Sequence, residues 1–181
     1  GPGTRLLLIG ANLVAEQLAS LADGMEMEVW ICDPRPDAFA QWPHAFTHNS
    51  DAYPDDLIRQ HFQSPNDIII TLAHDPRVDD MALMEALISP AAYIGALGSQ
   101  RTTAQRLTRL RALDLNEAAL ARLHAPVGLD IGSKTPLEIA IAIAAGLIAF
   151  RAQRSPRPKV PMPTETEAGD NSIAVPAGVI T

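Results

Sequence analysis

The sequence is short of cysteine and of positive charge, and each of these two shortages argues against a class of protein. A single cysteine, Cys32, cannot form an internal disulfide, which excludes a disulfide scaffold and favours a reducing compartment. Acidic residues outnumber Lys and Arg by 21 to 14, giving a net charge of −7. Binding to a nucleic-acid backbone needs an excess of Lys and Arg to displace counterions. We therefore expect no nucleic-acid partner. A free cysteine is most often buried, so we also expect Cys32 to be a buried thiol.

Long apolar runs and targeting patterns are also lacking. The longest apolar run, residues 139–150, is shorter than the roughly 20 residues that a membrane-spanning helix needs. No basic segment precedes an apolar stretch and a cleavage site, as in a secretory signal. These features predict a cytoplasmic protein without a membrane partner, in which residues 139–150 form a buried core helix.

The sequence does contain enough apolar residues for one substantial core. Apolar residues make up 47% of the 181 positions, which favours a single domain over two. We place this domain at residues 1–154. The composition then changes to prolines and acids that cannot form a core, so residues 155–181 are predicted to be a mobile tail. These residues include Pro156, Pro158, Pro161, Pro163, Glu165 and Glu167.

The first 33 residues follow the pattern of a βαβ unit. Residues 5–9 form a continuous apolar run, typical of a strand that is buried on both faces of a parallel sheet. Gly10 ends this run, residues 11–22 carry an apolar helical stripe, and residues 25–32 form a second apolar strand that ends at Asp33. The unit spans about 30 residues, as expected for such a motif.

Strands and helices are predicted to alternate over the rest of the domain. Further strands are expected at residues 46–48, 67–72 and 91–96, and helices at residues 54–62, 78–88, 99–113, 115–123 and 135–150. This order predicts an α/β fold with a doubly wound, Rossmann-like parallel sheet and helices on both faces. Ligands of such sheets bind at the carboxyl ends of the strands.

The glycine turn after the first strand has two open interpretations. A dinucleotide fingerprint reads G-x-G-x-x-G, whereas here only Gly10 is present, with Asn12 and Ala15 at the other two glycine positions. Asp33 follows Gly10 by 23 residues, a suitable distance for a carboxylate that binds a ribose. Binding of NAD(P) and a purely structural turn are both compatible with this pattern.

Two later turns carry polar groups to the same sheet edge. His74 could act as an acid, a base or a ligand, or it could be a solvated loop residue beside Asp75 as a helix cap. The segment Gly98-Ser99-Gln100-Arg101 combines free amides, a hydroxyl and a guanidinium at a helix start, which favours an anion site. The arginines that follow in this helix are interpreted as a solvated face: Arg106, Arg109 and Arg111.

The loop at residues 124–132 supplies one more candidate. Asp130 lies between Gly128 and Gly132, where it could face the same cleft or act only as a turn former. No histidine spacing matches a zinc site, and the sequence has neither a G-x-S-x-G elbow nor a phosphate-binding P-loop. We therefore assign no metal ligand and no catalytic residue.

Three ordered segments, residues 71–75, 93–101 and 124–140, together resemble the C-terminal Rossmann domain of xanthine dehydrogenase accessory proteins, the XdhC-type family. The resemblance spans about residues 4–151. It implies a maturation factor, rather than a catalyst, that binds molybdenum cofactor as molybdopterin or its dinucleotide form. It further implies assistance in sulfuration of the cofactor and delivery to a molybdenum hydroxylase such as xanthine dehydrogenase, with a cysteine desulfurase as a further partner.

The candidate cofactor-binding residues are those at matching motif positions, together with Asn12: Gly10, Asn12, Asp33, His74, Asp75, Gly98, Ser99, Arg101, Gly128, Asp130 and Gly132. The chain departs from the family pattern where Asn12-Leu13 replaces Gly-His, where Gly146 replaces a glutamate, and in having no counterpart of a separate N-terminal domain. Two alternatives stay open, an NAD(P)-dependent oxidoreductase and a non-catalytic interaction module that docks on a molybdoenzyme. A homodimer is the expected assembly.

Overall fold

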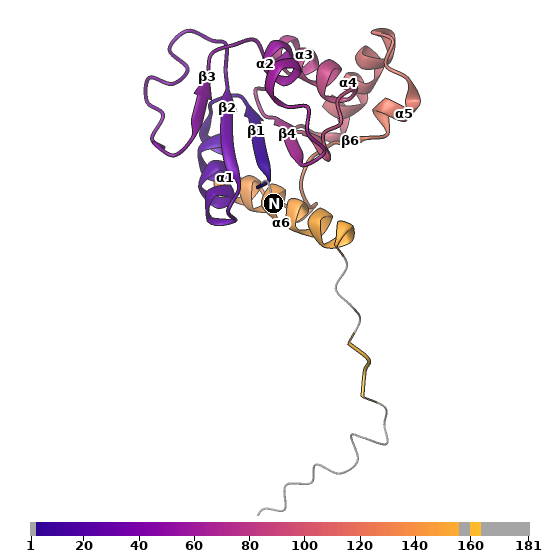
Figure 1. The fold of residues 1–181 in the computed structure, drawn as a ribbon. Helices are drawn as coiled ribbons and strands as arrows, with labels where there is room; N and C mark the ends of the chain where they lie inside the picture. Colours follow the sequence, from indigo (N-terminus) through magenta and orange to yellow (C-terminus); the bar gives the residue numbers. More distant parts are fainter. Residues whose placement is uncertain (1–2, 156–159, 164–181) are drawn as a thin grey trace, which may run out of the picture.

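The computed structural model describes residues 3–155 and 160–163. Most of the predicted tail, residues 155–181, therefore lies outside the described residues. The described part holds one six-stranded sheet flanked by helices (Figure 1). All of its strand pairs are parallel, and the strand order is β3-β2-β1-β4-β5-β6. The strands are β1 (Arg5–Ile9), β2 (Glu28–Cys32), β3 (His48–Ser50), β4 (Asp67–Thr71), β5 (Tyr93–Ala96) and β6 (Leu123–His124).

Helices cover both faces of this sheet, which confirms the predicted Rossmann-like α/β fold. Helices α1 (Leu13–Gly24) and α6 (Pro136–Arg154) pack side by side on one face (Figure 1). On the other face lie α2 (Pro54–His61), α3 (Pro76–Ala86) and α4 (Gln100–Ala112). The short helix α5 (Glu117–Leu120) connects α4 to β6.

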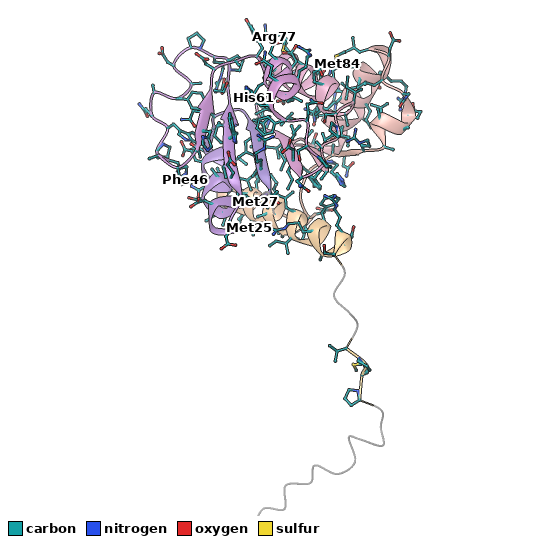
Figure 2. All side chains as sticks on the ribbon, viewed as in Figure 1. Met25, Met27, Phe46, His61, Arg77 and Met84 are labelled. Atoms are coloured by element: carbon teal, nitrogen blue, oxygen red, sulfur yellow. The ribbon has the colours of Figure 1, made fainter. Side chains whose placement is uncertain are left out.

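The alternation of side chains along each strand produces two hydrophobic clusters. In β1, Leu6 and Leu8 join the cluster under α1 and α6, whereas Leu7 and Ile9 join the cluster under α2, α3 and α4. The strand is therefore apolar throughout, because both of its faces are covered. Figure 2 shows Met27, which belongs to the first cluster, and Met84, which packs on the second, on opposite sides of the sheet.

Several predicted boundaries were wrong, and backbone geometry explains them. The second strand begins at Glu28 rather than at residue 25, because Glu26 has a φ of 64° and turns the chain after α1. Strand β3 lies at residues 48–50 rather than 46–48, where it pairs with β2. Helix α5 is shorter than predicted, and β6, which sequence analysis missed, follows it.

The apolar helix α6 is buried on one face only, which corrects the prediction of a buried core helix. Ala140, Ile143 and Leu147 face the core, while Ile141 and Ile148 are about half exposed. By length and composition alone, Pro136–Arg154 also meets the criteria for a helix that crosses a membrane. Its buried face packs against α1 and the hydrophobic cluster on that side of the sheet.

The thiol of Cys32 is buried at the end of β2, as predicted. Its sulfur donates to the carbonyl oxygen of Ala52 at 3.2 Å. Burial, together with the nearby charges of Asp33 and other carboxylates, raises the pKa of Cys32 to about 12. A protonated, enclosed thiol is a poor nucleophile and a poor metal ligand.

Candidate functional site

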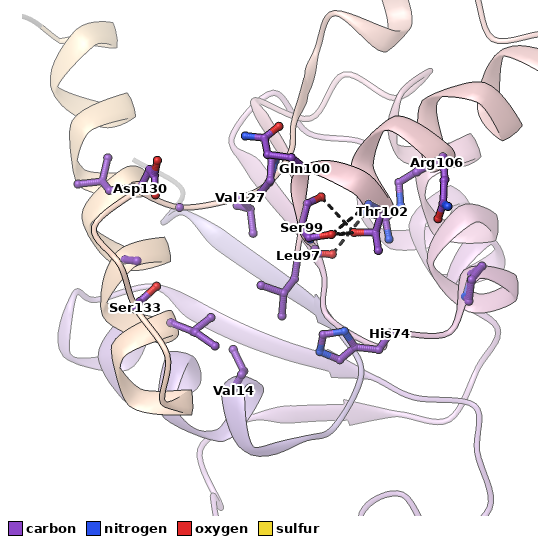
Figure 3. A pocket seen from close by; sticks show the side chains of 18 of the residues that line it. Val14, His74, Leu97, Ser99, Gln100, Thr102, Arg106, Val127, Asp130 and Ser133 are labelled. Atoms are coloured by element: carbon purple, nitrogen blue, oxygen red, sulfur yellow. Dashed lines mark hydrogen bonds between the residues drawn. The ribbon is translucent and has the colours of Figure 1, made fainter.

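The main cavity of the described residues lies at the carboxyl edge of the sheet, where the turns after β4, β5 and β6 meet. It has a volume of about 750 Å³ and is bounded by the start of α4, the loop after β6 and the side of α6. Figure 3 shows His74 and Asp130 on opposite sides of it, with Ser99 and Gln100 at the start of α4. Its volume lies in the range of about 300–1,000 Å³ that is typical of small-molecule sites.

The start of α4 lies at this cavity, which Ser99, Gln100 and Thr102 line. Ser99 is the N-cap, and its side chain accepts a hydrogen bond from the amide of Thr102 at 3.1 Å. The Thr102 hydroxyl accepts from the amide of Ser99 in return, at 2.8 Å. The first amides of an α-helix have no partner within the helix, and here those of Gln100 and Arg101 are not used by this capping box. The partial positive charge of the helix start favours an anion at this place.

Arg106, two turns further along α4, is buried beside the cavity. Its side chain is only 6% exposed and lies near two carboxylates of α3, 3.7 Å from Asp79 and 3.6 Å from Asp80. Its Nη1 donates a long hydrogen bond of 3.4 Å to the carbonyl oxygen of Leu97. Within the described part of the chain, its Nε has no hydrogen-bond partner. A guanidinium with five donors is therefore poorly satisfied here.

The two carboxylates beside Arg106 differ in their contacts. Asp80 accepts hydrogen bonds from Arg109 at 2.7 and 3.3 Å, a paired arrangement that holds α3 against α4. Asp79 is 1% exposed and accepts from the amide of Ala73 at 3.2 Å. Burial raises the pKa of Asp79 to about 6, because it outweighs the opposing effects of the Ala73 hydrogen bond and the Arg106 charge.

This raised pKa predicts a pH-dependent effect of Asp79→Asn on stability. The folded state holds the Asp79 proton more tightly than the unfolded state, so ionised Asp79 costs stability as pH rises from about 4 through about 6. Each pKa unit corresponds to about 1.4 kcal/mol, so we expect the variant to be more stable than wild type by about 1–3 kcal/mol at pH 8. At pH 4 the difference should nearly vanish, because Asn resembles the protonated carboxyl.

Urea unfolding at the two pH values measures this effect. Asp80→Asn is the matched control, because it weakens the pair with Arg109 and should destabilise the protein at pH 8. A loss of stability in Asp79→Asn at pH 8 would show that the ionised carboxylate of Asp79 is needed as a partner of Arg106.

The structure brings five of the sequence-predicted site residues together around the cavity. They come from three different turns of the sheet edge, and they are His74, Gly98, Ser99, Gly128 and Asp130. His74 has a φ of 59°, which turns the chain between β4 and α3. Gly128, with a φ of 96°, lies against α6, where an added Cβ would be 3.0 Å from the amide nitrogen of Ile143.

The polar residues of the first βαβ unit make structural contacts instead of lining the cavity. The Asn12 side chain caps α1 by accepting from the amide of Ala15 and donates to the carbonyl oxygen of Leu72. The carboxylate of Asp33 accepts from the amide of Ala11 at 2.9 Å and pairs with Arg35. Burial raises the pKa of Asp33, but the hydrogen bonds from Arg35 and Ala11 outweigh it and keep the pKa below the ordinary value.

The remaining sequence-predicted residues lie near the cavity without lining it. Gly10 has a φ of 110° and allows β1 to approach the turn after β4. Asp75 caps α3 by accepting from the amide of Arg77 and also pairs with the Arg77 guanidinium. Arg101 is an exposed residue in the first turn of α4, and Gly132, with a φ of 74°, turns the loop before α6.

Asp79 and Arg106 were not predicted as site residues, and the interpretation of Arg106 as part of a solvated face was wrong, because its side chain is buried. Thr103, Arg106 and Leu110 are the buried residues of α4, and their spacing of three and four positions is that of one helix face. An arginine between buried positions on such a face was the available signal. Arg111 is exposed, as predicted, and pairs with Glu117.

Comparison with known proteins gives a family match over most of this domain. The sequence model of the XdhC Rossmann domain matches residues 6–147. The chain is 28% identical over 155 residues to a probable xanthine dehydrogenase subunit of Bacillus subtilis, covering 83% of this chain and 44% of that protein. It is 26% identical over 150 residues to the molybdenum cofactor insertion chaperone PaoD of Escherichia coli, covering 83% and 41%.

A solved structure agrees with these sequence matches. The crystal structure of a xanthine dehydrogenase from Bacillus halodurans superposes with a TM-score of 0.73 and 28% sequence identity, covering 86% of this chain and 46% of that chain. The chain thus spans less than half the length of each of these three relatives.

Proposed function

We propose that this chain, which belongs to the XdhC Rossmann domain family, binds molybdenum cofactor as cargo for insertion into a molybdenum hydroxylase such as xanthine dehydrogenase. Two relatives support this role, one named as part of xanthine dehydrogenase and one as a molybdenum cofactor insertion chaperone. The single observation that carries the proposal is the cavity at the carboxyl edge of the sheet, with the start of α4 and a buried arginine on its wall.

The chemistry of this cavity fits the cargo. Molybdopterin joins a flat, polar pterin to a phosphate, so its site needs an apolar wall, hydrogen-bonding groups and positive charge. Val14, Leu97 and Ile139 supply apolar wall, while His74 and Asp130 supply polar groups. Arg106 and the amides at the start of α4 supply the positive charge. The volume of about 750 Å³ suits a ligand of this size.

Sulfuration of the bound cofactor is a finer part of the proposal. Among the described residues Cys32 is the free cysteine, and its thiol is buried away from the cavity with a pKa raised to about 12 by burial. This chain is thus poorly suited to carry the sulfur itself, so we propose that a separate cysteine desulfurase supplies the sulfur to the cofactor held here. The chain then protects and presents the cofactor in the cytoplasm.

An anaerobic titration with molybdopterin tests the proposed function. We expect saturable binding with a stoichiometry of one per chain, and transfer of the bound cofactor to cofactor-free xanthine dehydrogenase. An absence of saturable binding by the folded protein would refute the proposal.

The NAD(P)-dependent oxidoreductase alternative is tested in parallel with NAD and NADP as titrants. The contacts of two side chains weigh against it. The Asp33 carboxylate accepts from Ala11 and Arg35, and the Asn12 side chain is bonded to Leu72 and Ala15. We expect affinity for either nucleotide to be at least 10-fold weaker than for molybdopterin. Tighter binding of NAD or NADP would favour the oxidoreductase.

A further inference from the structure

The unsatisfied donors of Arg106 are the starting observation. A buried guanidinium normally pairs closely with a carboxylate or fills its five donors with hydrogen bonds. Here the two carboxylate contacts, at 3.7 and 3.6 Å, are longer than hydrogen bonds, and the Nε atom has no partner among the described residues. The side chain is nevertheless 94% buried, at the wall of the cavity. Because these contacts are long, the side chain has donor capacity left for a ligand that carries hydrogen-bond acceptors.

The second observation is the short distance between Arg106 and Gly98, the residue before the N-cap of α4. The Nη1 atom of Arg106 lies 3.7 Å from the position that a Cβ on Gly98 would occupy. That Cβ would also lie 2.5 Å from the Thr102 hydroxyl oxygen of the capping box. Glycine at this position therefore lets the chain pass close to Thr102 and to the Arg106 guanidinium at the entry to α4.

From these two observations we infer that Arg106 and the amide of Gln100 form a subsite for the phosphate group of a small phosphorylated ligand. The inference rests on the proposed function in one respect, since it assigns this subsite to the phosphate of molybdopterin. A guanidinium binds two phosphate oxygens through parallel hydrogen bonds, and the helix start adds further donors and a favourable dipole.

Asp79 competes with a bound phosphate for the Arg106 guanidinium. Its carboxylate is buried beside the guanidinium and holds it in place by charge and not by close hydrogen bonds. An arriving phosphate must draw Arg106 away from Asp79, which is left with the Ala73 amide. Neutralising Asp79 should therefore raise the affinity for phosphate, whereas removing Arg106 should lower it.

Calorimetric titration of the whole chain with inorganic phosphate and pyrophosphate at constant pH tests the subsite. Removing Arg106 alone would leave buried carboxylates uncompensated and could unfold the protein. The informative variant is thus Asp79→Asn with Arg106→Gln, which removes one charge of each sign and keeps the Asp80 pair with Arg109. We expect the affinity for pyrophosphate to fall about 10- to 100-fold in this double variant, because charge-assisted hydrogen bonds are lost.

Two further variants complete the design. Asp79→Asn alone should bind pyrophosphate several-fold more tightly than wild type. Arg111→Gln is the matched control, since Arg111 is an exposed arginine of the same helix that pairs with Glu117, and its removal should change the affinity less than twofold. Urea unfolding of each variant confirms that the compared proteins are folded.

The outcomes separate the subsite from the proposed function. The subsite is refuted if wild type does not bind pyrophosphate, or if the folded double variant binds it as tightly, whatever the result with molybdopterin. If pyrophosphate binding depends on Arg106 but molybdopterin does not bind, the subsite stands and the proposed function fails. If molybdopterin and a pterin without phosphate bind with equal affinity, the assignment of the subsite to the molybdopterin phosphate is wrong.

Discussion

Replacement of Gly10 by alanine should destabilise the protein by about 3–5 kcal/mol, because both steric overlap and backbone strain oppose it. The added Cβ would lie 2.9 Å from the Cα and 3.0 Å from the backbone nitrogen of Ala73, which are rigid atoms of the neighbouring turn. The φ of 110° at Gly10 is also disfavoured for any residue with a side chain. Strands β1 and β4 are central in the sheet, so a shift there disturbs both clusters.

Urea unfolding measures this loss, provided that the slope of the transition does not change. Gly24→Ala is the matched control, because an added Cβ there meets no atom within 4 Å, and the change should stay within about 1 kcal/mol. A loss of less than about 1 kcal/mol in Gly10→Ala would mean that the turn relaxes easily. Gly10 would then have no structural requirement for glycine.

Replacement of Asp33 by alanine should cost about 2–4 kcal/mol at neutral pH, although the residue occupies the position of a ribose-binding carboxylate. Asp33 is 2% exposed, and its two oxygens accept from the amides of Ala11 and Arg35 and from the Arg35 side chain. It thereby ties the turn after β1 to the end of β2. The variant leaves the Ala11 amide without its acceptor.

The effect of Asp33→Ala should decrease at acidic pH. Hydrogen bonds from Arg35 and Ala11 hold the pKa of Asp33 below its ordinary value, despite burial that raises it. The contribution of Asp33 to stability is therefore complete above about pH 4 and is lost as pH falls through the lower folded pKa. Unfolding at pH 7 and pH 3 tests this, with Asp23→Ala at an exposed position as the control. A loss of stability below about 1 kcal/mol at pH 7 would mean that the contacts of Asp33 contribute little to folding. Its carboxylate would then be available for a ligand.

Local patterns were sufficient to predict most of the fold. The strands β1 and β4 are buried on both faces, so their apolar runs were unambiguous. Helix α6 begins where the capping box of Thr135 and Glu138 predicts it. In contrast, the two-residue strand β6 has no periodicity of its own and exists because Leu123 and His124 pair with β5.

The candidate site was only partly predictable, for a related reason. Glycine, serine and aspartate after the ends of strands indicate the carboxyl edge of the sheet. Ser99 and Asp130 were predicted in this way, and both line the cavity. The roles of Arg101 and Arg106 depend on which face of α4 meets α3, and this packing sets Asp79 beside Arg106. No short-range signal in the sequence links two residues that are 27 positions apart.

Filling the cavity with a large side chain tests whether molybdenum cofactor binds there. Ser133 lines the cavity in the loop before α6, so Ser133→Trp should occupy it without disturbing the core. Ser20→Trp, on the exposed side of α1, introduces the same side chain away from the cavity. In an anaerobic titration with molybdopterin, we predict wild-type affinity for Ser20→Trp and at least a 10-fold loss for folded Ser133→Trp. Equal affinities in the two variants would contradict the assignment of this cavity to molybdenum cofactor.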